Sequence, residues 1–424
     1  MLIFLSVFLQ CLLVLSAPAP PGLDLVVVIQ GGILLAILAC GMWRSALYPA
    51  GGDFDRRTIM LYSALLGYFF LRAVFDIVLQ EGQAIEFIRH TASITVPGAC
   101  FLPWLFTARR GSLSRLMIWS ALPGLLQLIL ILGVQMFVGS ADDGAQAAIE
   151  RITLIDPRTT QTGIVFLFGL LATCAVIPAS KYLRLVSAVG CAIASVVCMA
   201  TLMRSMLLIL GCQLVVAVLC SILSHGVGYT LRKLMPSVAF AALASVLALA
   251  SVPRFHASME AFVERVSTTD LGEGRIEGEW DIALSQFAYA SGDSLLTALF
   301  GFGPRFSFES SFGDARAYLH NVELFWLIFY GLVGAAIGCG LLYACSARVI
   351  RNCRGASLAS CYVACCWFGL LAYAQVFAVH KLVLYNVQFA ILLVVISVSV
   401  PGVAPRKAEG AGTGQIDLRR RLSR

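Results

Sequence analysis

Residues 205–224 read SMLLILGCQLVVAVLCSILS, a run without a single charged side chain. A helix of about 20 apolar residues is long enough to cross the hydrocarbon core of a bilayer. Similar runs recur along the chain, which is 59% hydrophobic and 12% charged, with a mean hydropathy of +0.89. Because backbone polar groups in lipid must be bonded within their own segment, these runs are predicted to be helices. The sequence therefore predicts an all-α fold, a polytopic integral membrane helix bundle.

The apolar runs predict about twelve transmembrane helices. Their ranges are 2–17, 23–43, 58–80, 91–107, 116–138, 162–178, 185–203, 205–224, 234–252, 319–345, 356–378 and 381–400. The chain then divides into nine N-terminal spans (1–252), a large extracytoplasmic loop between spans 9 and 10 (253–318), three C-terminal spans (319–400) and a disordered basic tail (401–424). Residues 1–17 have two readings, a retained span or a cleaved signal peptide, because Ala-Pro-Ala-Pro-Pro follows them but no basic segment precedes them.

The net charge of +7 does not predict nucleic-acid binding, because the basic residues lie in short connections and in the tail. Basic connections alternate with less basic ones, as the positive-inside rule requires, and this places the N- and C-termini in the cytoplasm. The fourteen cysteines fall almost entirely within apolar runs, which argues against a disulfide framework and a zinc site. No phosphate-binding glycine loop of the ATPase type is present, so no cofactor is predicted.

The loop 253–318 is too long to be a simple connection. Phe255, Met259, Phe262, Val263 and Val266 share one helical face, and Trp280, Leu284 and Phe287 repeat this spacing. We expect two amphipathic helices at the outer membrane interface, which either cover the bundle or form a lid over a site.

Three basic side chains of the predicted outer side are candidates for catalysis. His320 opens the tenth span, where an imidazole can accept a proton from a hydroxyl near neutral pH, although it could instead only cap the helix. Arg204 lies beside hydrocarbon on the predicted outer side, where positive charge is disfavoured, so it is either a functional residue or a snorkelling arginine that sets topology. Arg275 lies among glutamates, so by itself it could be a surface ion pair.

Four further residues are candidates for substrate binding. Arg72 is four residues from Asp76, so the two share a face of the third span and form either a structural pair or part of a headgroup cavity. Asn321 follows His320 directly, and Arg305 and Trp280 lie in the long loop. No metal-binding set of His, Cys or Asp residues is found on the outer side, so the predicted chemistry is metal-independent.

These residues occur in an order that resembles the superfamily of O-antigen ligases and Wzy-type O-antigen and exopolysaccharide polymerases. The resemblance rests on Arg204-Ser205 at an outer span end, Arg275 with Trp280, Gly301-Phe302-Gly303, His320-Asn321, and Gly331 to Gly334 in Tyr-Gly-Leu-Val-Gly. It covers about residues 200 to 340 by motif and the whole chain by topology. The motifs are short, so they indicate the superfamily and not one member.

The resemblance implies an inverting, metal-independent glycosyltransferase of the bacterial inner membrane. Its donor would be an undecaprenyl-pyrophosphate-linked oligosaccharide, with Arg204 and Arg275 holding the pyrophosphate and His320 acting on the acceptor hydroxyl. Its partners would be membrane lipids and the flippase and chain-length regulator of the same pathway. A polymerase that joins repeat units is the leading expectation. An O-antigen ligase that transfers the glycan to lipid A core is the nearest alternative.

Two other classes of membrane protein fit less well. A transporter or lipid flippase would suit about twelve spans, but no paired halves are detectable in the sequence. A glycosyltransferase of the GT-C class would need an acidic motif in a sizeable first outer loop, where this chain has only Asp24.

Overall fold

The computed structural model describes most of the hydrophobic part of the chain. The described residues are 1–15, 24–47, 55–79, 84–107, 110–137, 162–177, 180–200, 204–251, 276–303, 308–309, 315–316, 319, 321–353, 357–376 and 382–398. The predicted amphipathic segment 255–266 and the predicted tail 401–424 lie outside these residues, so neither prediction is tested.

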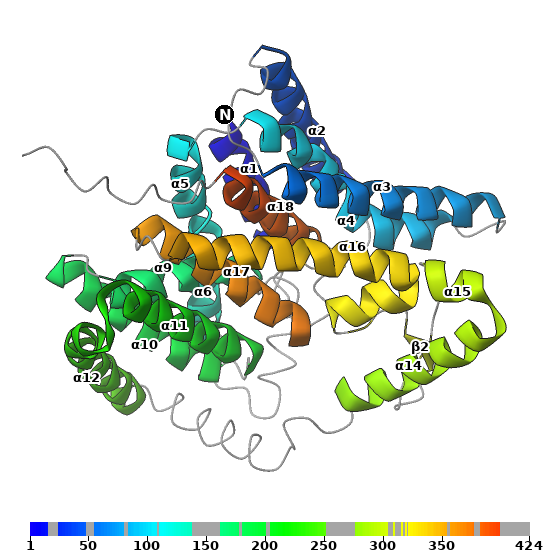
Figure 1. Ribbon diagram of the computed structural model, residues 1–424. Helices are drawn as coiled ribbons and strands as arrows, with labels where there is room; N and C mark the ends of the chain where they lie inside the picture. Colours follow the sequence, from blue (N-terminus) through cyan, green and yellow to red (C-terminus); the bar gives the residue numbers. More distant parts are fainter. Residues whose placement is uncertain are drawn as a thin grey trace, which may run out of the picture.

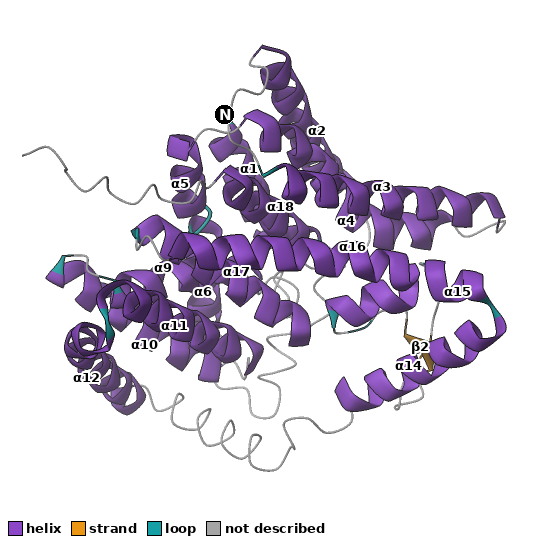
Figure 2. Ribbon diagram, viewed as in Figure 1, coloured by secondary structure: helices purple, strands orange, loops and turns teal. Residues whose placement is uncertain are grey.

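The described chain is helical, apart from one short two-stranded ladder (Figures 1 and 2). The N-terminal helices are α1 (Leu2–Leu15), α2 (Asp24–Leu47), α3 (Arg56–Leu79), α4 (Ala84–Thr107), α5 (Arg110–Trp119) and α6 (Leu122–Phe137). The central helices are α9 (Thr162–Val176), α10 (Lys181–Ala200), α11 (Arg204–His225) and α12 (Val227–Ser251). The remaining elements are α14 (Ile276–Asp293), α15 (Leu295–Phe300), β1 (Phe308–Glu309), β2 (Ala315–Arg316), α16 (Val322–Cys353), α17 (Leu358–Val376) and α18 (Val383–Val398).

The prediction of an all-α membrane-type fold is confirmed at this coarse level. Six of the described helices are long and apolar enough to cross a membrane, and five shorter apolar helices accompany them. The count of twelve spans stays a prediction. One predicted range is wrong in detail: 116–138 is not a single helix, because a turn at Ser120 and Ala121 separates α5 from α6. Pro123 follows this turn in the first turn of α6, where the missing N–H of proline costs no helical hydrogen bond.

The core of the bundle lies around α18, in which every residue from Leu384 to Val398 is buried. α18 packs against α4, α5, α16 and α17, and Gln388 on α18 donates a hydrogen bond to Gln10 on α1 (3.3 Å). The first helix is therefore packed into the bundle, with Leu9 and Val14 fully buried.

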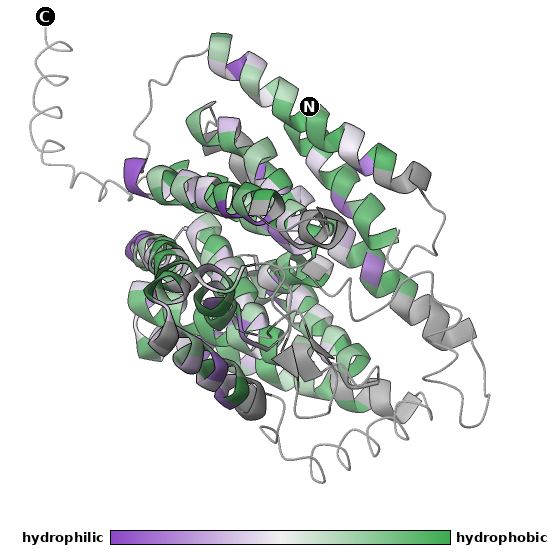
Figure 3. Cartoon of the chain, turned by 90° about the vertical axis from the view of Figure 1, so that its right-hand side faces the viewer, coloured by the Kyte–Doolittle hydropathy of each residue, from purple (hydrophilic) through white to green (hydrophobic). Residues whose placement is uncertain are grey.

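The outer surface of the helices is as apolar as the core. On α3, Phe70, Leu71, Phe75 and Val78 are exposed. Figure 3 shows hydrophobic residues along the outward faces of the helices as well as between them. Such a continuous exposed apolar surface is typical of helices that face lipid rather than water.

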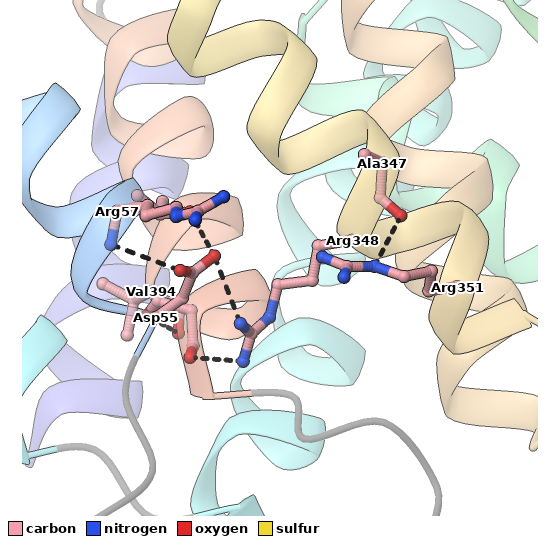
Figure 4. Close-up of polar contacts among 8 residues, drawn as sticks. Asp55, Arg57, Ala347, Arg348, Arg351 and Val394 are labelled. Carbon is pink, nitrogen blue, oxygen red and sulfur yellow. Dashed lines mark hydrogen bonds and ion pairs between the residues drawn. The ribbon is translucent and has the colours of Figure 1, made fainter.

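A polar cluster joins three helices at one end of the bundle (Figure 4). Arg348 on α16 forms an ion pair with Asp55 (3.1 Å) and donates a hydrogen bond to the carbonyl of Ser397 on α18 (3.0 Å). Asp55 directly precedes α3 and also accepts from Thr58 Oγ1 (2.8 Å). Arg57 and Arg351 surround this pair, and by the positive-inside rule this end is the predicted cytoplasmic one.

Candidate functional site

The structure describes only part of the predicted site. Arg275, Arg305 and His320 lie outside the described residues, so their predicted roles are untested. The backbone of Arg204 is described as the first residue of α11, but its side chain is not. Arg72, Trp280 and Asn321 are described together with their surroundings.

The described candidates on α3 and α16 lie in the half of the bundle that is away from the Asp55–Arg348 pair. α3 and α16 pack against each other, and Asp55 and Arg348 join the start of α3 to the last turns of α16. Arg72 and Asp76 lie toward the other end of α3, which is the predicted outer one. The first half of α16 folds back at Gly331 along the second half, with Trp326 against Gly338. Asn321 therefore lies deeper in the bundle, where Val322 lines the same hollow as Leu342.

The packing of α11 on α17 brings the backbone of Arg204 to the same half of the bundle. Cys212 Sγ donates to the carbonyl of Phe368 (3.8 Å), and further along α11 Cys220 lies close to Cys361 near the start of α17. The two helices are therefore antiparallel, and the start of α11 meets the end of α17. Gln375, one residue before that end, contacts Asn321. The backbone of Arg204 is thus on the side of the bundle that carries Asn321.

Three glycines form a close junction between α15 and α16. Gly301 and Gly303 have φ values of 72° and 83°, and Gly331 within α16 has a φ of 68°. This left-handed region is readily open only to glycine. A Cβ on Gly301 would lie 2.5 Å from the backbone nitrogen of Gly331. The two backbone segments therefore approach too closely for any residue other than glycine at this position. The Gly301-Phe302-Gly303 motif of the sequence therefore allows the turn after α15 to pack closely on α16.

Gly331 interrupts α16 and so divides it into a first half, Val322 to Tyr330, and a long second half. The break frees backbone carbonyls that a continuous helix would use. The amide of Phe302 donates to Ile328 O and that of Gly303 donates to Phe329 O, both at 2.9 Å. Tyr68 on α3 donates its hydroxyl to Tyr330 O (2.6 Å). The three carbonyls that directly precede the break thus gain partners from α3 and from the turn, which offsets the cost of the broken helix.

Arg72 and Asp76 form the predicted same-face pair, at 2.8 Å. Their side chains are only 13% and 6% exposed. Arg72 also donates to the carbonyl of Gly301 (3.3 Å), and Gly303 lies directly against the Asp76 carboxylate. The role predicted for Arg72, substrate binding, is untested. What the structure shows is that its guanidinium is engaged by Asp76 and by the glycine turn.

Asn321 is buried at the start of α16 and takes part in a side-chain network. Its Oδ1 accepts from the amide of Leu324 (2.8 Å), which caps the helix. Its Nδ2 donates to Gln375, and Gln375 Nε2 donates to both carboxylate oxygens of Glu323 (2.9 and 2.7 Å). The glutamate also lies where the helix dipole favours negative charge. This network fixes the residue that directly follows His320.

Sequence reasoning missed Gln375, Glu323 and Tyr68 as members of this site. Gln375 carries one signal, since it is a polar side chain near the end of the otherwise apolar α17. Nothing in the sequence pairs it with Asn321, which is 54 residues away.

Trp280 lies on α14, where a helix is observed over the predicted Trp280, Leu284 and Phe287 pattern. Phe287 is buried and packs edge-on against Phe302 of the glycine turn, while Trp280 is 39% exposed. Trp280 is therefore much more exposed than Phe287. Among the described residues, no hydrogen bond or ring contact is seen between Trp280 and the glycine junction. Its predicted role in binding stays a prediction.

An apolar hollow adjoins the start of α16. Val322 lines it together with side chains of α3, α4 and α18, among them Tyr62, Phe69, Tyr385 and Asn386. Within the described part of the chain, no group of three or more His, Cys, Asp or Glu side chains is placed to hold a metal ion. The described part of the bundle thus combines a buried ion pair, an amide–carboxylate network and, deeper between Tyr62 and Leu342, an apolar hollow.

No family model matches this sequence, and no curated protein matches it significantly. The functional assignment therefore rests on the residues and their geometry.

Proposed function

We propose that the protein is a Wzy-type polysaccharide polymerase that joins polyprenyl-pyrophosphate-linked oligosaccharide repeat units on the outer face of the bacterial inner membrane. The observation that carries the proposal is that motifs far apart in the sequence come together in the half of the bundle that is away from the Asp55–Arg348 pair. Gly301-Phe302-Gly303 packs on Gly331, and Asn321 lies at the start of the same half-helix. The backbone of Arg204 is brought to this half by α11.

The proposed reaction needs no ATP, because the donor sugar is already activated by its pyrophosphate leaving group. The acceptor hydroxyl attacks the anomeric carbon while the bond from that carbon to the pyrophosphate oxygen breaks, which inverts the configuration. His320 takes the hydroxyl proton or orients the hydroxyl. Arg204 and Arg275 neutralise the charge that develops on the leaving pyrophosphate, an effect that is larger in a poorly solvated site.

The network at Asn321 supports this assignment of His320. A catalytic base must be held in place by its surroundings. Asn321 is fixed by its cap on Leu324 and by Gln375, and Glu323 holds Gln375 in turn. The residue that follows His320 is thus tied to two helices, α16 and α17.

A transporter remains the second candidate function because of two specific observations. Ionisable side chains within membrane spans often mark transport pathways, and Arg72 and Asp76 are such a pair. Helices broken near the substrate are also typical of transporters, and α16 is broken at Gly331. Both features are, however, engaged in the glycine junction, which favours a structural role for them.

The test is a transfer assay with purified protein in lipid, supplied with undecaprenyl-pyrophosphate oligosaccharide. Wild type is compared with His320→Ala and with His225→Ala, a control at the other end of α11 that stacks on Tyr229. A ladder of longer lipid-linked glycans from wild type and His225→Ala, but not from His320→Ala, supports a polymerase. Transfer that occurs only after addition of lipid A core would identify a ligase. If no transfer occurs with either acceptor, the transporter becomes the favoured candidate function.

A further inference from the structure

We propose that Arg72 and Asp76 are a positioning pair: they hold the Gly301–Gly303 turn against α16 and thereby set the place of Asn321. This inference rests on the proposed function for its meaning in catalysis, but its structural content can be tested separately. It assigns the buried ion pair to the shape of the site and not to direct contact with substrate.

The Arg72–Asp76 pair contacts the Gly301–Gly303 turn at two points. Arg72 Nη1 pairs with Asp76 (2.8 Å), while Nη2 donates to the carbonyl of Gly301 (3.3 Å). Gly303 lies so close to both side chains that a Cβ there would be 2.8 Å from Arg72 Nη2. The guanidinium, whose donors are arranged in a rigid fork, therefore joins α3 to the turn in a fixed geometry.

The turn is itself hydrogen-bonded to α16 at its break. The amides of Phe302 and Gly303 bond to the carbonyls of Ile328 and Phe329, and Gly301 touches Gly331. These bonds form only when α16 is bent at Gly331, because in a continuous helix those carbonyls bond to amides four residues further on. Holding the turn therefore holds the bend.

The bend is linked to Asn321 by the first half of α16. The first half of α16 runs only from Val322 to Tyr330, with Asn321 as its cap. One end of this half-helix is tied by the turn and by Tyr68, and the other by Gln375 on α17. Because a short helix moves nearly as a rigid rod, loosening one end shifts the other.

The molecule contains its own matched control. Asp55 and Arg348 form a second ion pair between the start of α3 and α16, at the opposite end of the same two helices (Figure 4). Loss of this pair removes a contact between the same elements without touching the turn. It therefore separates a general loosening of α3 on α16 from the specific effect on Asn321.

The experiment is hydrogen–deuterium exchange on the full-length protein in lipid nanodiscs. Asp76→Asn and Arg72→Lys are compared with wild type and Asp55→Asn, using samples that elute as single species. The amides to follow are those of Phe302 and Gly303 in the turn and those of Leu324 and Phe325, which bond to Asn321 at the far end of the half-helix. We expect exchange at both places to accelerate about tenfold or more in the Asp76 variant, since it leaves Arg72 without its charged partner, and to a smaller extent in Arg72→Lys.

Asp55→Asn should leave both places at the wild-type rate. Acceleration at the turn alone would overturn the inference, because the bend would not be transmitted to Asn321. Equal acceleration in Asp55→Asn, or none in either Asp76→Asn or Arg72→Lys, would overturn it as well. The exchange result does not depend on turnover, so a wild-type protein that forms no glycan ladder would refute the proposed function without deciding this inference.

Discussion

At the scale of single residues, Gly331 combines a positive φ with close contact to the backbone of another segment. Its φ of 68° disfavours any side chain, and a Cβ there would meet the carbonyl of Leu299 and the amide of Gly301. A positive φ in a non-glycine residue costs about 1–2 kcal/mol before any clash is counted. The clash is with backbone atoms, which cannot move without disturbing the turn.

We expect Gly331→Ala to lower the thermal stability of the purified protein and its transfer activity together. The matched control is Gly211→Ala on α11, where a Cβ meets nothing within 4 Å. There alanine should be neutral or stabilise the helix by up to about 1 kcal/mol. Thermal unfolding followed by size-exclusion chromatography measures both, and equal melting temperatures for the two variants would contradict the account of Gly331.

The two arginines assigned to pyrophosphate are tested singly. We expect Arg204→Ala or Arg275→Ala to lower transfer about 100-fold or more, because each removes a charge aimed at the leaving group. The fold should remain intact. The measurement is initial rate with the lipid-linked donor, with Arg232→Ala, an exposed side chain on α12, as control. Near-normal turnover in either variant removes the pyrophosphate role of that arginine.

At the scale of elements, the bundle is held together by a few hydroxyl groups that reach carbonyls of other helices. Tyr362 on α17 is buried, and its hydroxyl lies 2.8 Å from Met117 O on α5 and 3.1 Å from Phe166 O on α9. Since neither helix is adjacent to α17 in sequence, this one side chain joins three distant segments. In an apolar interior each carbonyl that loses such a partner is costly.

Tyr362→Phe should therefore destabilise the bundle by about 1–3 kcal/mol. Tyr343→Phe makes the same chemical change at a side chain that is 78% exposed on α16, and we expect no measurable effect. The measurement is the midpoint of unfolding in a denaturing detergent titration. A shift of equal size in both variants would show that the three-helix contact does not contribute.

At the scale of the whole molecule, two ion pairs mark the two ends of the α3 and α16 pair. Asp55–Arg348 lies among basic residues, whereas Arg72–Asp76 lies under the glycine turn. The distribution of Lys and Arg predicts that the first end is cytoplasmic. All the proposed chemistry would then take place on the outer side of the membrane.

This orientation predicts the accessibility of two inserted epitopes in the full-length protein. One inserted after Ser310 should bind antibody in intact spheroplasts, and one after Lys407 should bind only after the membrane is permeabilised. The physical reason is that translocation of basic connections is disfavoured. Antibody binding to the Lys407 epitope in intact cells would reverse the assignment and place the glycine junction in the cytoplasm.

The sequence predicts the helices well and their contacts poorly. Runs such as 205–224 and 381–400 are recognised by their length and apolarity. α11 extends one residue beyond the first run at each end, and α18 lies within the second. The spacing of Arg72 and Asp76 is local, so their pairing on one face could be predicted and is confirmed. The break between α5 and α6 was not predicted, since apolar residues continue through it.

The junction itself depends on contacts between residues far apart in the chain. Neither Gly301 against Gly331 nor Asn321 with Gln375 has a local signal, because each pair is brought together only by the packing of whole helices. A glycine within a membrane helix can serve close packing as well as a bend. The sequence therefore points to the residues of the site but not to the way in which they hold one another.

The break in α16 also has a consequence for how the protein is made. The chain is synthesised from its N-terminus, so the turn at Gly301–Gly303 is made before Ile328, Phe329 and Gly331. A helix of 32 residues can enter the bilayer as one straight segment, because all its backbone bonds are then internal. The bend forms only when the previously exported turn meets it. The outer end is thus completed late in biosynthesis, by a segment made early closing on one made afterwards, and a nascent chain that stops before α16 carries the turn without its partner.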